Sequence, residues 1–351
     1  MIRDFMFNGM GYLCNQDIYD NISLASFKKV FELVDLLYGT SFIAELDQAT
    51  KEGLCNIASV EKLLDISVED LLSYIDLGIS QSSDFEHHKL DYPAYKKAID
   101  DFIFETIQLE TTHSDAYSKN HDGTTDHRRN LYDMLVDYGL DFSDRNSFIT
   151  FNYDLLLDKA VSINDRGLLG DYAVPFVSVS HFDGYNRILR KERLPRDVDI
   201  LKLHGSLNWA VCSQCNSPHL AYYYRYKRLP QEHCSLCQGL LAPVLVPPTY
   251  RKDIGRYTFL AKVWEKAEEM IREADEITIV GYSFPDADIE AKWLFKRALL
   301  GRGKRPMLVL VEPASVVRSK VRGIFLHTVE SCVEYENFME YCKETGCYRK
   351  K

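Results

Sequence analysis

Four of the nine cysteines fall into two pairs whose spacing can bind a metal ion. The pairs are Cys212-Ser-Gln-Cys215 and Cys234-Ser-Leu-Cys237, and 18 residues separate them. Two thiolates held two residues apart can reach one ion, and two such pairs complete the tetrahedral set that zinc prefers. Because four protein ligands leave no open position for a substrate, the sequence predicts a structural zinc site rather than simply buried thiols. His219 and His233 flank the pairs and are alternative ligands.

A second group of polar residues follows short apolar runs in the second half of the chain. Each set stands directly after one run: Asn152 and Asp154 after 147–151, His204, Gly205 and Ser206 after 199–203, Gly281 and Ser283 after 277–280, and Glu312 after 307–311. Taken singly, these residues have ordinary explanations as a helix cap, a core histidine or a tight turn.

The apolar runs alternate with helical patterns over 153–160 and 288–300. This alternation predicts parallel βαβ units, and therefore an α/β fold built on a doubly wound, Rossmann-like sheet. Ligands of such a sheet bind in the crevice beyond the carboxyl ends of its strands. We therefore expect Asn152, His204 and Ser283 to converge on one cleft.

The order of these motifs resembles that of the sirtuin superfamily (silent information regulator two), whose members bind NAD. Phe-Asn-Tyr-Asp at 151–154 resembles the family's Gln-Asn-Ile-Asp motif, with Phe in place of Gln. Lys-Leu-His-Gly-Ser at 202–206 resembles its Glu-Leu-His-Gly-Ser motif, and Gly-Tyr-Ser at 281–283 resembles its Gly-Thr-Ser loop. Residues 239–246 resemble the segment that leads out of the zinc module. The likeness runs from about Phe148 to Val311.

Within that superfamily, the amino-acid sequence of residues 148–154, 202–209 and 279–284 is most similar to that of bacterial sirtuin-like defence proteins. The resemblance implies a cytoplasmic NAD+ glycohydrolase of antiviral defence, which converts NAD to nicotinamide and ADP-ribose. It implies that Asn152 holds a water or the ribose and that His204 accepts a proton as a base poised near neutral pH.

The resemblance also implies which residues contact the bound NAD. Asp154 would orient the nicotinamide carboxamide or cap its own helix. The remaining expected contacts come from Gly205, Ser206, Gly281, Ser283 and Glu312. Among these, Ser283 and the Gly281 backbone are expected at phosphate or ribose, and Glu312 at a ribose hydroxyl, where the family usually has Asn.

Two other functions remain open from the sequence. The first is an NAD-dependent protein deacylase, but residues 247–250 are Pro-Pro-Thr-Tyr where deacylases carry Phe-Gly-Glu. The second is a module that binds NAD or another nucleotide without turnover. Incubation of the protein with NAD, with and without an acetylated peptide, would separate the three.

The predicted organisation has two parts. Residues 1–145 form a mostly helical N-terminal region and insertion of the NAD-binding domain, with helices over 23–38, 60–64, 68–77 and 92–109 and exposed loops over 80–88 and 111–129. Gly39 stands where a C-terminal helix cap belongs. Residues 146–351 form the sirtuin-like core. A zinc module at about 210–242 carries the Tyr-rich stretch 222–226.

The glycine-rich loop with which sirtuin-like chains begin is not evident here. One interpretation makes Ile2–Phe7 the first strand and Asn8–Gly11 the remnant of the loop. The other, which we favour, places Met1–Met6 in the helix that follows the loop, so that the strand and loop are missing. Because that strand is central in a doubly wound sheet, its loss would leave a gap between its neighbours.

The composition of the chain limits the classes of molecule that the protein is expected to bind. The 351 residues carry a net charge of −10, which disfavours sequence-independent nucleic-acid binding. No run of 18 apolar residues predicts a membrane span, and no basic segment followed by an apolar one predicts secretion. Clustered cysteines favour a metal site in a reducing compartment. The expected partners are NAD and either a second copy of the chain or a protein of the same defence system.

Overall fold

The structure is a computed structural model that describes residues 5–14, 23–52, 66–81, 90–114, 131–142, 145–163, 170–180, 198–221, 233–246, 257–286 and 288–345. The chain forms two compact units. Helices α1 to α5 belong to the first unit, and the elements from α6 onward belong to the second. The expected domain boundary at 145/146 stays a prediction. The Tyr-rich stretch, residues 60–64 and residues 247–250 lie outside the described residues.

The first unit is helical. Its elements are α1 (Phe5–Cys14), α2 (Leu24–Tyr38), α3 (Phe42–Glu52), α4 (Val68–Ser80) and α5 (Tyr92–Ser114). Phe27 and Phe31 lie one helical turn apart on α2, and both pack edge-on against Phe102 of α5, with ring centroids 4.8 and 6.0 Å away. Gly39 ends α2 in the left-handed conformation, at φ 65°, as the sequence predicted.

The first described residues of the chain are helical rather than extended. Phe5–Cys14 form α1, so the interpretation of Ile2–Phe7 as a strand followed by a loop at Asn8–Gly11 is wrong. Met6 and Met10 are fully buried and lie four residues apart on one helical face. This apolar spacing of four favours a helix over a strand, whose buried positions repeat every two residues.

The second unit contains the predicted parallel strands, but they form two sheets of three strands. One sheet has the order β1 (Ser147–Thr150), β4 (Val198–Lys202), β2 (Gly170–Asp171). The other has the order β8 (Glu276–Val280), β9 (Met307–Val311), β10 (Ser331–Tyr335). Strands β4 and β9 are central and almost wholly buried, whereas β1 and β8 are edge strands and only partly buried. Among the described residues, no strand pairs with the second edge of β1 or β8.

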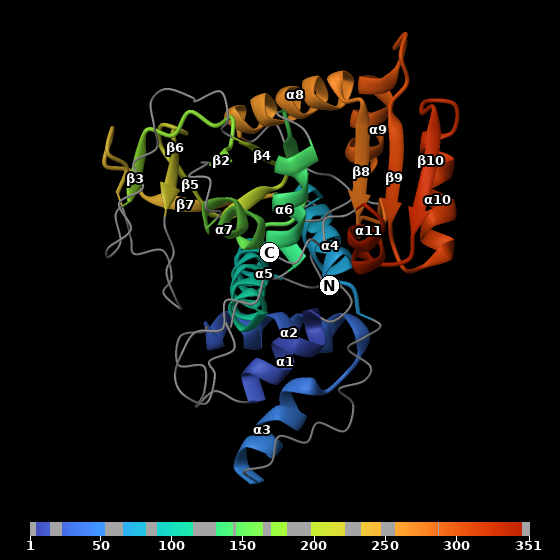
Figure 1. Cartoon of the computed structure of the whole chain (residues 1–351). Coiled ribbons are helices and arrows are strands. Elements are labelled where there is room, and N and C mark those ends of the chain that lie inside the picture. Colours follow the sequence, from blue (N-terminus) through green and yellow to red (C-terminus); the bar gives the residue numbers. More distant parts are fainter. Residues whose placement is uncertain are drawn as a thin grey trace, which may run out of the picture. The chain divides into compact units, whose positions relative to one another are not determined.

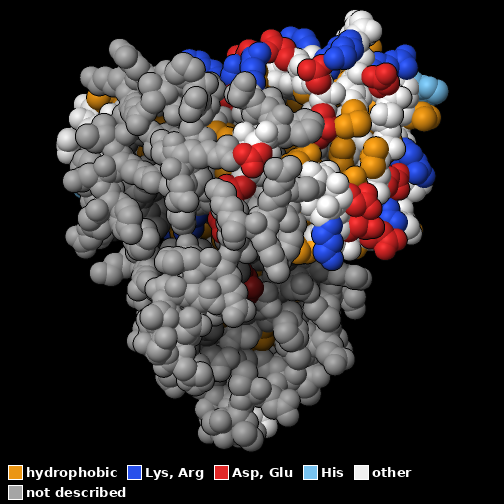
Figure 2. Space-filling model, in the orientation of Figure 1, with side chains coloured by type: hydrophobic (Ala, Val, Ile, Leu, Met, Phe, Trp, Pro, Cys, Tyr) orange, Lys and Arg blue, Asp and Glu red, His pale blue; other side chains and the backbone are white. Residues whose placement is uncertain are grey.

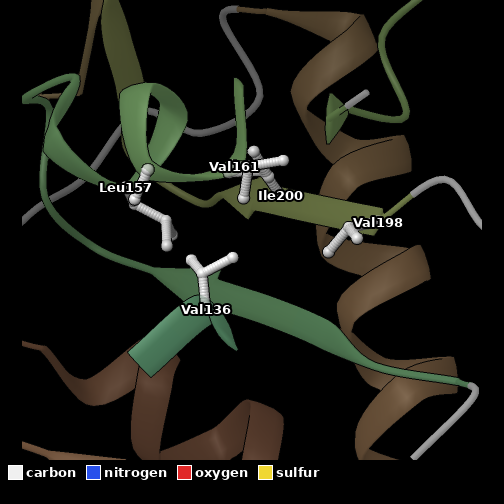
Figure 3. Close-up of a cluster of buried hydrophobic side chains, with 6 residues drawn as sticks. Val136, Leu157, Val161, Val198 and Ile200 are labelled. Carbon is white, nitrogen blue, oxygen red and sulfur yellow. The ribbon is translucent and has the colours of Figure 1, made fainter. Parts of the chain in front are cut away.

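Helix α6 (Leu131–Phe142) packs against both parallel sheets. Its residue Val136 points toward Leu157 and Val161 of α7 (Leu156–Ile163) and toward Val198 and Ile200 of β4 (Figure 3). Its residues Met134 and Tyr138 pack against Val309 and Val311 of β9 and against Tyr341 of α11 (Phe338–Glu344). The helix therefore packs on both sheets, between which the described residues form no strand pairing.

Three longer helices complete the second unit (Figure 1). They are α8 (Thr258–Glu273), α9 (Ile289–Leu299) and α10 (Ser315–Phe325). Helix α8 packs against both β4 and α9. Its Trp264 donates from the indole Nε1 to the Leu203 carbonyl oxygen at 2.9 Å, directly at the end of β4.

A third sheet joins the end of β4 to the cysteine pairs. It has the order β3 (Ser178–Ser180), β6 (Pro218–Ala221), β5 (Gly205–Cys212), β7 (Leu241–Leu245). Strand β5 is buried along its whole length and runs antiparallel to β6 and β7. It begins directly after His204 and ends at Cys212, so one buried strand links the candidate base to the candidate metal site.

Gly205 provides a test of this junction. Its φ is +88°, and a Cβ there would overlap the backbone oxygen of Val244 in β7. Gly281 has a similar φ of +62°, but a Cβ there would meet no atom within 4 Å. Gly205→Ala should therefore lower the free energy of unfolding by clearly more than the 1–3 kcal/mol or so expected for backbone strain alone in Gly281→Ala. Urea unfolding of both variants measures the two free energies of unfolding, and equal losses of stability in the two variants would contradict the prediction.

The described part of the surface mixes charges and apolar side chains. On the face drawn in Figure 2, acidic and basic side chains alternate with hydrophobic ones. No helix within the described ranges is both long enough and apolar enough to cross a membrane.

Candidate functional site

The ends of β1, β4 and β8 meet through three aromatic side chains. Phe151 follows β1, His204 lies two residues beyond β4, and Tyr282 lies two residues beyond β8. The ring of Phe151 lies 5.1 Å from that of His204 at an interplanar angle of 67°, and 4.4 Å from that of Tyr282 at 8°. The carboxyl ends of strands from both parallel sheets therefore converge.

His204 is buried among aromatic rings. Its side chain is 4% exposed. Beyond Phe151, the rings of Tyr153 and Trp264 lie 6.3 and 6.4 Å from the imidazole. The preceding residue, Leu203, is fixed on both sides, because its amide donates to the Thr150 carbonyl oxygen at 3.0 Å and its carbonyl accepts the Trp264 indole. The imidazole is thus held on a rigid piece of backbone.

Asn152 is exposed in the turn after β1. Its backbone amide donates to the Thr150 hydroxyl oxygen at 3.1 Å, which fixes the turn after β1. Its side chain hydrogen-bonds to Tyr132 of α6. Burial raises the pKa of Tyr132 to about 12, the nearby Asp154 charge adds to the rise, and the Asn152 hydrogen bond opposes it. Tyr132 therefore keeps its proton near neutral pH and serves as a fixed partner for Asn152.

Asp154 is a buried carboxyl group with one oxygen engaged. Its Oδ1 accepts from the Leu156 amide at 3.0 Å at the start of α7. Its Oδ2 is buried and has no hydrogen-bond partner among the described residues. Burial raises the pKa of Asp154, and the nearby Lys202 ammonium lowers it in part. Lys202, itself fully buried, is paired with Asp158 at 2.8 Å between Nζ and Oδ2.

These contacts predict how Asp154 contributes to stability. Because its folded-state pKa is raised, the stability present at low pH is lost as pH rises through that pKa. Asp154→Asn keeps an oxygen for the Leu156 amide but cannot ionise, so it should gain stability relative to the natural protein between pH 4 and pH 8. Asp154→Ala also loses the acceptor, which should cost about 1 kcal/mol relative to Asn. Urea midpoints at several pH values test both, and a relative gain by the natural protein at higher pH would contradict the prediction.

Gly205 and Ser206 shape the turn between β4 and β5. The Ser206 hydroxyl donates to Asn208 Oδ1 at 2.6 Å and contacts the Tyr153 carbonyl oxygen at 3.5 Å. It is fully buried, so these bonds tie β5 to the turn after β1. The expected contact of Gly205 and Ser206 with a cofactor stays a prediction.

The turn after β8 leaves open space in front of its backbone. Gly281 donates its amide to the Val311 carbonyl oxygen at 3.0 Å and has free volume where a side chain would stand. Tyr282 donates its hydroxyl to Asp288 Oδ2 at 2.6 Å, and burial raises the pKa of Tyr282. Ser283 lies next in this turn and is half-buried. The expected contact of Gly281 and Ser283 with phosphate or ribose stays a prediction.

Glu312 lies at the end of β9. Its Oε1 accepts from the Ala314 amide at 3.0 Å, just before α10, and its own amide donates to the Tyr335 carbonyl oxygen at 3.1 Å. One carboxylate oxygen is thus used in the local turn. A contact between Glu312 and a ribose hydroxyl stays a prediction.

The four cysteines form a compact group. Their Sγ atoms all lie within 4.8 Å of one another. The distance is 3.3 Å between Cys212 and Cys237 and 3.6 Å between Cys215 and Cys234. Four sulfurs at about 2.3 Å from one tetrahedral zinc ion would be about 3.8 Å apart, so the group fits this ion.

Both cysteine pairs have the same local backbone. In each pair, the residue after the second cysteine is left-handed, Asn216 at φ 55° and Gln238 at φ 63°. The amides of these two residues donate to the carbonyl oxygens of Cys212 and Cys234 at 3.0 and 2.9 Å. The repeated turn brings the two sulfurs of each pair to the same side, as a metal site requires.

Hydrogen-bond donors around the sulfurs favour the thiolate form. Burial opposes ionisation of Cys234, but the Ser217 hydroxyl and two backbone amides lower its pKa to about 5. The Gly239 amide likewise favours ionisation of Cys237, but the sulfurs of Cys212 and Cys215 raise its pKa to about 12. A divalent cation removes this mutual repulsion and lets all four thiols ionise.

The two flanking histidines have other partners. His219 is buried, and its Nε2 lies 3.2 Å from the Ser217 hydroxyl. His233 is exposed, and its Nδ1 lies 2.8 Å from the Gln238 carbonyl oxygen. Neither histidine belongs to the group of four cysteines. Among the described residues, those four cysteines are the group whose ligand atoms lie close enough together to hold a metal ion. The alternative in which a histidine replaces a cysteine has no support in this geometry.

Several side chains of the site could not be predicted from the motifs. Tyr132 and Trp264 come from helices outside the strand-end pattern, and their roles depend on how α6 and α8 pack. Phe151 and Tyr282 lie inside the quoted motifs, so adjacency to the strand ends was the signal that could have identified them. Asp288 follows the last quoted motif, but its contact with Tyr282 could not be predicted, because it depends on the conformation of the turn.

Comparisons with known proteins found similar solved structures and one family model. Similar solved structures include a Sir2 homologue in complex with NAD, at 16% identity, a TM-score of 0.37, and coverage of 71% of this chain and 73% of that one. Another is Sir2 bound to an acetylated peptide, at 14% identity, a TM-score of 0.35, and coverage of 80% and 100%. No curated protein matches the sequence. A family model described as the SIR2-like domain matches residues 146–330, more than half of the chain and all of the strand ends described above. The chain therefore belongs to the SIR2-like domain family.

Proposed function

We propose that the protein is an NAD+ glycohydrolase, which cleaves NAD to nicotinamide and ADP-ribose. The observation that carries the proposal is the contact of Phe151 with both His204 and Tyr282. It brings a candidate base, at the end of β4, beside the open turn after β8. Membership of a family with NAD-binding relatives supports NAD as the ligand of this crevice.

In this proposal, His204 and Asn152 act at the reacting carbon. Cleavage of the nicotinamide–ribose bond builds positive charge on the ribose, and water must then add to that carbon. Asn152 is exposed and anchored by Tyr132, so its amide can hold the water or the ribose in place. The His204 imidazole accepts the proton that the water or a ribose hydroxyl loses.

Asp154 would hold the nicotinamide group. Its Oδ2 is buried and lacks a partner among the described residues, which is costly unless a donor arrives with the ligand. The carboxamide nitrogen of nicotinamide is such a donor. Gly281 and Ser283 offer backbone and hydroxyl groups to phosphate or ribose at the turn after β8, and Gly205, Ser206 and Glu312 are the remaining proposed contacts.

Zinc would serve structure rather than chemistry. Cys212, Cys215, Cys234 and Cys237 would occupy all four positions, and the bound ion would crosslink the segments that surround β5. Since β5 begins directly after His204, this crosslink fixes the backbone on one side of the candidate base.

The decisive experiment incubates the purified protein with NAD. We expect free nicotinamide and ADP-ribose to appear without any peptide. Nicotinamide release that requires an acetylated peptide, with transfer of the acetyl group, would instead identify a deacylase. Saturable NAD binding without turnover would identify a binding module.

The biological setting is part of the same proposal. We place the activity in the cytoplasm, in bacterial antiviral defence, where loss of NAD starves an infected cell, with a second copy of the chain or a defence-system protein as partner. Cells that carry the gene should lose NAD after phage infection, whereas cells with His204→Ala should keep it. Equal NAD levels in both strains would contradict the defence role.

A further inference from the structure

A row of side chains connects the turn after β8 to the candidate base. Asp288, directly before α9, is buried and accepts the Tyr282 hydroxyl at 2.6 Å between Oδ2 and the phenol oxygen. The Tyr282 ring stacks on Phe151, and Phe151 meets His204 edge-on. Three successive contacts therefore join Asp288 to His204.

Two aromatic rings contact the Tyr282 ring. Phe151 lies on one side at 4.4 Å and 8°, and Phe284 lies at 4.6 Å and 58°. Phe284 is fully buried and packs edge-on against Phe295 of α9 and Phe325 of α10, at 5.4 and 5.8 Å. Tyr282 is thus anchored in the core of the sheet that contains β8 and β9.

The stack also lies where strand pairing is absent. Phe151 and His204 belong to the sheet of β1 and β4, whereas Tyr282 belongs to the sheet of β8 and β9, and no ladder of backbone hydrogen bonds joins β1 to β8 in the described residues. At this edge, the contact between the Phe151 and Tyr282 rings links the two sheets. A shift of one sheet against the other would be transmitted to His204 through that contact.

We propose that Tyr282, anchored by Asp288, is a positioning residue that sets the orientation of His204 through the Phe151 ring. This inference rests on the proposed function for its kinetic test, but the geometry it predicts can be measured without any activity. Tyr282 does not itself touch the reacting atoms in this proposal. Its effect on the rate passes through the imidazole.

The activity-independent test is the NMR signal of the His204 ring. The protein is labelled with ¹⁵N and ¹³C histidine, and the His204 signal is assigned by its loss in His204→Ala. Tyr282→Leu removes the stacked ring and should shift and broaden that signal. Phe151→Leu removes the partner ring, which belongs to the sheet of β1, and should also shift and broaden the His204 signal. This variant replaces Tyr282→Leu in the test if Tyr282→Leu does not fold. An unchanged His204 signal in a folded Tyr282→Leu or Phe151→Leu variant would overturn the proposal.

Matched variants separate positioning from loss of a hydroxyl. Tyr282→Phe keeps the stacked ring, so it should recover most of what Tyr282→Leu loses. Tyr12→Phe is the control, because Tyr12 also donates its hydroxyl to a carboxylate, that of Glu110, but belongs to the first unit and not to the row of contacts. It should leave both the His204 signal and the rate unchanged. A Tyr282→Phe variant that is as impaired as Tyr282→Leu would overturn the role of the ring.

The kinetic test uses the His204→Ala background. Tyr282→Leu should lower kcat for NAD cleavage by about 10–100-fold, the range expected when a catalytic group is misplaced by up to 1 Å, with a smaller change in KM. Combined with His204→Ala, it should have almost no further effect on kcat, because the two residues act as one unit. Additive losses would overturn the proposal. If the natural protein does not cleave NAD, the proposed function fails, and the NMR result alone decides the positioning role.

Discussion

Replacing His204 by Ala should lower kcat for NAD hydrolysis by about 10²–10⁴-fold, because a general base typically contributes that much. The imidazole is 4% exposed and is enclosed by Phe151, Tyr153 and Trp264. A smaller side chain leaves a cavity, so His204→Gln is a second variant that keeps more volume but cannot act as a base. Both should lose activity, and circular dichroism and thermal unfolding should show a retained fold.

The matched control for this prediction is a substitution of His327, an exposed histidine more than 100 residues beyond His204 in the sequence. His327 has φ 67°, a conformation that Asn tolerates better than most residues, so His327→Asn is preferable to Ala. It should retain full activity. NAD hydrolysis by a folded His204→Gln variant at the natural rate would contradict the assignment of the base.

Asn152→Ala extends the same prediction to the positioning of water. Its amide is held by Tyr132, and loss of a group that fixes a reactant near the reacting carbon can cost about 100-fold. Since Asn152 is exposed, the free energy of unfolding should change little. Tyr132→Phe removes the anchor but keeps Asn152, so it should give a smaller loss of kcat in the same assay.

The strand ends were predictable because their signals are local. Apolar runs at 147–151, 199–203, 277–280 and 307–311 correspond to β1, β4, β8 and β9 within one or two residues. Their order also predicted that Asn152, His204 and Ser283 would converge on one cleft, and this stays a prediction. Gly39 was predictable for the same reason, since the left-handed end of α2 requires no information from distant residues.

The division of the parallel strands into two sheets depends on contacts between distant segments. One doubly wound sheet was expected, with a gap if its first strand were missing. The structure has β1 and β8 as separate edges, joined by α6 packing and by the Phe151–Tyr282 stack. Neither link follows from periodicity, because α6 lies outside the motifs and an aromatic stack depends on side-chain orientation. The third sheet was missed because β5 runs antiparallel to β6 and β7 with no helix between them among the described residues, so it lacks the alternation of strands and helices that predicted the other two sheets.

Removal of the metal should have the largest effect on stability. Structural zinc contributes an apparent free energy of about 10–16 kcal/mol in zinc-finger peptides, comparable to the whole stability of about 5–15 kcal/mol of a typical domain. We expect about one zinc ion per chain by elemental analysis of the purified protein. Prolonged dialysis against a strong chelator should remove it and unfold the segment from Cys212 to Leu245, visible as rapid amide hydrogen exchange there.

Cys234→Ser tests the same site without a chelator. Cys234 is fully buried and lies 3.6 Å from Cys215 between the two Sγ atoms, so the change removes a ligand from the interior of the site. Zinc content should fall and local exchange should rise. Cys332→Ser in β10 is the matched control, because Cys332 is outside the group of four and should leave both unchanged.

Loss of the metal should also affect His204, the candidate base. Strand β5 extends from Gly205 to Cys212, with a shift in its register against β7 between Ser206 and Ala210, so loosening of the cysteine pairs frees the strand that begins next to His204. We therefore expect Cys234→Ser to lower kcat for NAD hydrolysis although no cysteine contacts the cleft in our proposal. A metal-free protein with natural stability would contradict the structural role of zinc. Full activity in a Cys234→Ser variant with exchanging β5 amides would show instead that His204 is held by β4, Phe151 and Trp264 alone.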